Sequence, residues 1–133
     1  LRIWAKLDGW NQDWFSAMSR SRFALEEILG ALASFARTTP VTIQTMLCEL
    51  GGSAPVPGDA KAYAACLAGL LGAGARIEAA QLYTLARAPS EAYVRPLSDA
   101  VLRAFAGEVS AALNGAVPVS AFGERGLGPL SAQ

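Results

Sequence analysis

The feature that most constrains the fold is an alternation of polar and apolar residues in the stretch 79–91, which reads A-A-Q-L-Y-T-L-A-R-A-P-S-E. In an extended chain Gln81 and Tyr83 point to one side and Leu82 points to the other. Pro89 cannot donate a hydrogen bond to a neighbouring strand, so the strand should end before it. A strand of this kind packs its apolar side against helices and turns its polar side towards an interior or a cleft.

The same arrangement recurs along the chain, with a helical pattern after each of the first three strand candidates. Ser21, Asp59 and Ser98 are the expected N-caps of the three long helices. The order β-α-β-α-β-α-β predicts parallel strands joined by right-handed crossovers. The strand candidates are residues 1–8, 41–47, 79–88 and 116–122, and the helix candidates are residues 11–18, 23–37, 60–73 and 99–113. Gly9 is expected to end the first strand, residues 89–96 are expected to form a loop, and the apolar stripe of the helix over 23–37 includes Phe35.

Polar residues within the strand candidates distinguish between two kinds of parallel sheet. A doubly wound sheet buries both faces under helices and favours continuous apolar strands, which Lys6, Asp8, Gln44 and Gln81 interrupt. These residues fit half of a parallel barrel, whose ligands bind near the carboxyl ends of the strands. We therefore expect an α/β partial barrel over residues 1–123, with helices on its convex side only, and a flexible tail over 124–133.

Composition excludes several classes of function. Eleven basic residues balance eleven acidic residues, so charge gives no reason to expect nucleic acid or an anionic membrane as a partner. No apolar run is long enough to span a membrane. The absence of histidine excludes a Ser-His-Asp triad and a histidine-based zinc site within this chain. Cys48 and Cys66 are not in a metal-ligand spacing, and two cysteines suit a reducing cytoplasm, where we expect the protein to reside.

Three segments together resemble the radical S-adenosylmethionine superfamily, in the branch of iron–sulfur oxidoreductases near the wyosine-synthesis enzymes. They are W-A-K-L-D-G-W followed by W-F-S-A-M-S-R, then V-T-I-Q-T-M-L, then Q-L-Y-T-L-A-R-A-P-S-E with V-R-P-L-S. The resemblance covers nearly all of residues 1–123. It implies the C-terminal half of a (βα)6 partial TIM-type barrel, whose partner is the N-terminal half of the same barrel.

The chain departs from this family in one respect. The C-x-x-x-C-x-x-C loop that holds the family's [4Fe–4S] cluster is absent, and Cys48 and Cys66 lie 18 positions apart. The resemblance implies that the cluster loop lies upstream of Leu1, that the chain begins inside a longer protein and that this fragment alone is inactive. In the whole enzyme a reduced cluster would cleave S-adenosylmethionine, and the resulting 5′-deoxyadenosyl radical would abstract hydrogen from a substrate that this half does not identify.

The resemblance implies S-adenosylmethionine as the cofactor and no metal ligands in this chain. The candidate contacts to this cofactor are Lys6, Asp8, Gln44, Gln81 and Tyr83. A carboxylate suits ribose hydroxyls or an ammonium group. Alternatively, the Lys–Asp pair satisfies itself at a strand end, and the amides and the phenol form an internal polar layer across the sheet. The catalytic residues are not identified by the sequence.

Arg87 is the candidate substrate-binding residue, because its guanidinium can hold a carboxylate or a phosphate. A salt bridge to Glu91 or Glu49 is the alternative. Trp10 and Trp14 are predicted to plug the end of the barrel rather than to stack on a ligand. For the whole chain, the alternative to an enzyme fragment is a non-catalytic half-barrel, either a binding module or a truncated remnant.

Overall fold

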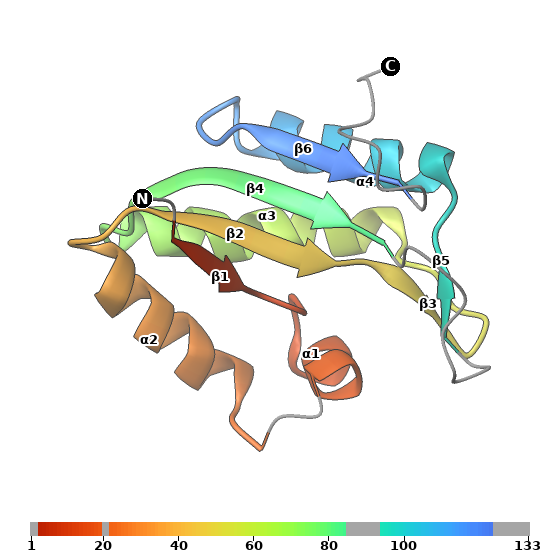
Figure 1. The fold of residues 1–133 in the computed structure, drawn as a ribbon, viewed down its shortest axis with the longest axis horizontal. Coiled ribbons are helices and arrows are strands. Elements are labelled where there is room, and N and C mark those ends of the chain that lie inside the picture. Colours follow the sequence, from red (N-terminus) through yellow and green to blue (C-terminus); the bar gives the residue numbers. More distant parts are fainter. Residues whose placement is uncertain (1–2, 20–21, 85–93, 124–133) are drawn as a thin grey trace.

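The computed structural model describes residues 3–19, 22–84 and 94–123 (Figure 1). The described part of the chain forms a mixed α/β fold with one larger parallel sheet and one small antiparallel sheet. In chain order its elements are β1 (Trp4–Lys6), α1 (Gln12–Ser19), α2 (Leu25–Ala36), β2 (Val41–Met46), β3 (Cys48–Leu50), α3 (Pro57–Gly72), β4 (Ile77–Tyr83), β5 (Val94–Pro96), α4 (Asp99–Ala112) and β6 (Val119–Phe122).

The larger sheet confirms the predicted parallel strands. Its order is β1-β2-β4-β6, and each neighbouring pair is parallel. The order in the sheet therefore follows the order in the sequence, as expected of successive β-α units. One row of the sheet runs from Lys6 through Gln44 and Gln81 to Ser120, since these residues are register partners.

The two faces of this sheet differ in burial. Ile43, Ala80 and Leu82 share one face and are fully buried in the hydrophobic core. Helix α3 packs against both α2 and α4, so these helices form one layer, and Figure 1 shows α3 and α4 behind the strands. On the other face Trp4 remains 56% exposed, and Gln44 and Tyr83 are partly exposed. We call this second side, which no described helix covers, the open face.

The antiparallel pair β3 and β5 was not predicted. Cys48 lies opposite Pro96 and Leu50 lies opposite Val94. Residues 89–96 were predicted to form a loop, because a strand of three residues is too short to show alternation. Pro96 is compatible with a strand here because a two-stranded sheet has only edge strands, where a missing N–H leaves no central ladder incomplete.

The beginning of α2 and one residue of its apolar stripe differ from the prediction. The helix starts at Leu25 and its N-cap is Ala24, so the assignment of Ser21 as the cap was wrong. The carboxylate of Glu27 accepts a hydrogen bond from the Ala24 N–H at 3.0 Å and so satisfies one of the free N–H groups at this end. Phe35, predicted to face the core, is 51% exposed.

The N-termini of α3 and α4 give one correction and one confirmation. Asp59 was predicted as the cap of α3, but the helix begins at Pro57, a residue favoured at the first helical position. Asp59 instead lies in the first turn, where its Oδ2 accepts a hydrogen bond from the N–H of Val56 at 2.8 Å. Ser98 caps α4 as predicted, since its hydroxyl accepts from the N–H of Val101 at 3.3 Å.

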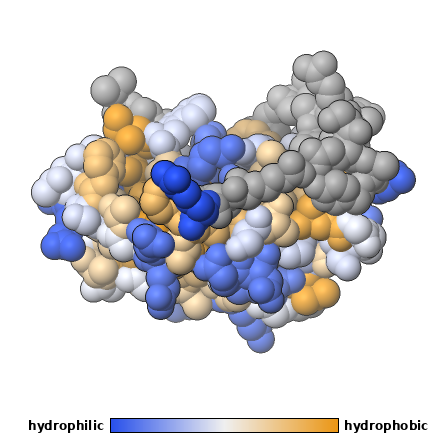
Figure 2. All heavy atoms as spheres, turned by 90° about the horizontal axis from the view of Figure 1, so that it is seen from below, coloured by the Kyte–Doolittle hydropathy of each residue, from blue (hydrophilic) through white to orange (hydrophobic). Residues whose placement is uncertain are grey.

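The strand bounds differ from those that the sequence pattern indicated, and three aromatic side chains of the described residues lie at the surface. Strand β4 ends at Tyr83, and the predicted extension towards Pro89 and the tail over 124–133 fall outside the described residues. Phe23 and Phe35, like Trp4, are about half exposed. Figure 2, viewed from the side of α1 and α2, shows apolar patches among polar ones on this side of the molecule. Within the described ranges, no helix combines the length and apolar character that crossing a membrane requires.

Candidate functional site

Two glutamine side chains lie side by side at the centre of the open face. Gln44 on β2 and Gln81 on β4 are direct register partners. The Gln44 Nε2 group donates a hydrogen bond to the Gln81 Oε1 atom at 3.3 Å. This bond uses one donor and one acceptor of the pair, and it leaves the Gln44 carbonyl oxygen and the Gln81 N–H groups for other partners. The pair therefore presents neighbouring acceptor and donor atoms.

The glutamine pair lies in a hollow of about 370 Å³ on the open face. Aromatic side chains from three strands complete its lining: Trp4 from β1, Tyr83 from β4 and Phe122 from β6. Tyr83 and Phe122 are register partners at the carboxyl ends of their strands. A hollow of this size, with aromatic walls and a few polar groups, has the character of a small-molecule site.

Lys6 and Asp8 form an ion pair beside this hollow. The Lys6 Nζ atom lies 3.7 Å from the Asp8 Oδ2 atom, and the N–H of Met46 donates to Asp8 Oδ1 at 3.4 Å. The pKa of Lys6 is raised mainly by the negative charge of the Asp8 carboxylate and, to a smaller extent, by the phenol of Tyr83. Neither Lys6 nor Asp8 is among the lining residues. The pair is close enough to the Tyr83 end of the hollow to contact a ligand that extends past it.

Four of the predicted ligand contacts lie together in the structure, whereas Arg87 is outside the described residues. The structure brings Lys6, Gln44, Gln81 and Tyr83 to one face, as the alternation predicted. Arg87 lies outside the described residues, so both its role in substrate binding and its alternative salt bridge stay predictions.

Two lining residues were not singled out from the sequence. Trp4 shares the strand face of Lys6, and Phe122 shares that of Ser120. The alternation of side chains along a strand was therefore the only sequence pattern that could have placed both residues on the open face. Both residues looked like ordinary apolar positions of a strand, where an aromatic side chain is common.

Trp10 belongs to the core and does not line the hollow, in agreement with its prediction as a plug rather than a stacking platform; whether it closes the end of a barrel stays a prediction. It is only 4% exposed, and its indole N–H donates to Asp59 Oδ1 at 2.9 Å. Its ring stacks on Trp14 at 4.9 Å and packs against Phe105 at 5.6 Å between ring centroids. The plug ties the segment after β1 to both α3 and α4.

The two cysteines do not fit a cluster site. Burial raises the pKa of Cys66 and raises that of Cys48 to about 11, so both thiols stay protonated near neutral pH. The Cys48 Sγ atom lies 3.5 Å from the Met18 Sδ atom, whereas the Cys66 thiol donates to the carbonyl oxygen of Trp10 at 3.6 Å. Nowhere in residues 3–19, 22–84 and 94–123 do three or more His, Cys, Asp or Glu side chains gather as metal ligands.

The chemistry that the open face offers is therefore binding. Its amides and the phenol can form directional hydrogen bonds, its rings can stack on a flat group, and the Lys6–Asp8 pair can meet a charged or hydroxylated end. This site is defined by its geometry alone, because comparison of the chain with protein-family models, with curated proteins and with solved structures found no match.

Proposed function

We propose that the open face binds S-adenosylmethionine and part of the substrate in a radical S-adenosylmethionine enzyme. In this proposal the chain is the C-terminal half of a (βα)6 partial TIM-type barrel, and an N-terminal half of the same barrel closes the cavity. The observation that carries the proposal is the hollow of about 370 Å³ on a face of a parallel sheet that no described helix covers. Parallel barrels bind ligands at the carboxyl ends of their strands, where Tyr83 and Phe122 lie.

The groups of the hollow match the parts of this ligand. The edge of adenine carries neighbouring donor and acceptor atoms, which the free oxygen of Gln44 and the free N–H groups of Gln81 can meet. The rings of Trp4 and Phe122 offer apolar surface against which a planar base can stack. Asp8 can accept hydrogen bonds from ribose hydroxyls or from the ammonium group, while Lys6 balances its charge.

The iron–sulfur cluster of that family does not fit the residues of this chain. It requires three thiolates on one loop, whereas Cys48 lies in β3 and Cys66 in α3, and burial keeps both protonated. We therefore assign to this chain the binding of the adenosine and substrate side only. No step of the reaction is routed through its cysteines.

The Gln81→Ala variant should weaken the binding of S-adenosylmethionine about three- to tenfold, with little change in melting temperature. A neutral hydrogen bond contributes roughly 0.5–1.5 kcal/mol, and Gln81 is partly exposed, so its truncation removes a ligand contact without opening the core. Isothermal titration calorimetry of the full-length protein that the proposal implies, beside a thermal melt, gives both quantities. Asp8→Ala should act in the same direction.

The matched control is Gln12→Ala, since Gln12 lies on α1 and bonds to Ser16 and to the N–H of Leu25. It should leave the affinity unchanged, whatever it does to stability. An unchanged affinity in Gln81→Ala together with a large fall in melting temperature would show that the polar layer is structural. Equal affinities of the wild type, Gln81→Ala and Asp8→Ala for S-adenosylmethionine would overturn the proposal.

A further inference from the structure

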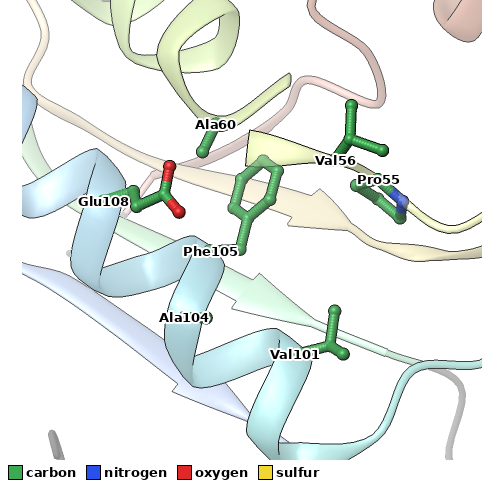
Figure 3. Close-up of a pocket in the computed structure, with 7 residues that line it drawn as sticks. All are labelled: Pro55, Val56, Ala60, Val101, Ala104, Phe105 and Glu108. Carbon is green, nitrogen blue, oxygen red and sulfur yellow. The ribbon is translucent and has the colours of Figure 1, made fainter. Parts of the chain in front are cut away.

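A second cavity lies on the helical side of the sheet, away from the open face. Its volume is about 210 Å³, and it is formed where the beginning of α3 meets the outer part of α4 (Figure 3). Apolar side chains make most of its lining, and one carboxylate completes it: Pro55, Val56, Ala60, Val101, Ala104, Phe105 and Glu108.

The floor of this cavity is preorganised. Phe105 is 5% exposed, and its ring is held by those of Trp10 and Tyr63, at 5.6 and 5.9 Å between centroids. The rim differs from the floor, because Val56 and Val101 are 60% and 39% exposed. A rigid aromatic floor below an exposed apolar rim can bury part of a ligand without a rearrangement of the core.

Glu108 gives the cavity a negative charge. Among the described residues that line the cavity it is the only ionisable one. Its carboxylate points to the side where Phe105 and Ala60 lie (Figure 3). The other nearby carboxylate, that of Asp59, is already engaged by the N–H groups of Val56 and Trp10. Among the described residues the ion pair found is that between Lys6 and Asp8. Glu108 therefore has no ion-pair partner in this part of the chain, and its carboxylate can bind a cationic ligand.

We propose that this cavity binds a small organic cation, a primary amine carried on a single apolar ring. A cavity of about 150 Å³ holds one benzene molecule, so 210 Å³ suits one ring with a short alkyl chain. The ring would pack on Phe105 between Val56 and Val101, and the ammonium group would lie beside Glu108. A partly apolar surrounding strengthens that attraction relative to bulk water.

The probe for this proposal is 2-phenylethylamine, with 2-phenylethanol as its neutral counterpart. Titration into the full chain, followed by amide chemical shifts, should give a dissociation constant on the order of 1 mM for the amine, as expected for so small a ligand. The shifts should centre on Ala104 and Phe105. The alcohol should bind about three- to tenfold more weakly, because it lacks the charge.

Two variants test the two halves of the proposal. Glu108→Gln removes the charge from this partly buried residue and should abolish the preference for the amine. Ala104→Leu fills the cavity and should abolish binding of both probes. Glu26→Gln, on the exposed side of α2, is the matched control and should change neither. Equal affinities for amine and alcohol in the wild type, or an unchanged preference in Glu108→Gln, would overturn the proposal.

Discussion

Replacing Trp10 by alanine should lower the free energy of unfolding by about 3–5 kcal/mol, the usual cost of removing a buried tryptophan. The ring is almost fully buried, and it fills the space between Trp14, Tyr63 and Phe105. The substitution also removes the indole N–H that donates a hydrogen bond to the Asp59 carboxylate at 2.9 Å. Equilibrium unfolding in urea, monitored by circular dichroism, measures the change.

Trp4→Ala is the matched control, because it makes the same chemical change at a residue that is 56% exposed. Its effect on stability should stay within about 1 kcal/mol, in line with other surface substitutions. Under the proposed function it should instead weaken ligand binding, since Trp4 lines the hollow of the open face. Equal losses of stability in the two variants would contradict the assignment of Trp10 to the core and Trp4 to the site.

The parallel sheet could be predicted from the sequence because two periodicities alternate along the chain. Strand segments repeat every two residues and helices every 3.6, so a β-α repeat is visible without any tertiary information. The face shared by Gln81 and Tyr83 follows from the same alternation. The contact between Gln44 and Gln81 does not, because it depends on the register between strands that lie far apart in the sequence.

Short elements and surface positions were harder to predict for physical reasons. The three-residue strands β3 and β5 are defined by pairing with each other, a contact between segments about 45 residues apart, rather than by local pattern. Phe35 follows the helical spacing of α2, yet the core does not extend to it. Gly9 was taken only as a strand end, whereas a Cβ there would lie 2.5 Å from the Cα of Phe15, so the glycine permits a close chain approach.

Ionisation linked to the Cys48 thiol alone should lower the free energy of unfolding by about 2–3 kcal/mol between pH 9 and pH 11. Cys48 is fully buried, and burial, aided by the negative charge of Asp8, raises its pKa from 9.0 to about 11. The unfolded thiol therefore ionises first, and the folded state holds the extra proton. This stabilisation is complete below pH 9 and is lost as the pH rises towards 11, at about 1.4 kcal/mol per pH unit.

Cys48→Ala separates this contribution from the others. Burial raises the pKa of Tyr63 as well, whose phenol bonds to Thr45 at 2.9 Å, so its share of the loss begins only above the ordinary phenol pKa of about 10. Urea unfolding of the variant, measured in steps from pH 8 to pH 11, should therefore give a free energy of unfolding that changes less than that of the wild type between pH 9 and 10. Above pH 10 the free energy of unfolding of the variant should fall. If wild type and Cys48→Ala lose stability equally between pH 9 and 10, the buried thiol is not the titrating group, and Cys66, whose pKa burial also raises, is the next residue to replace.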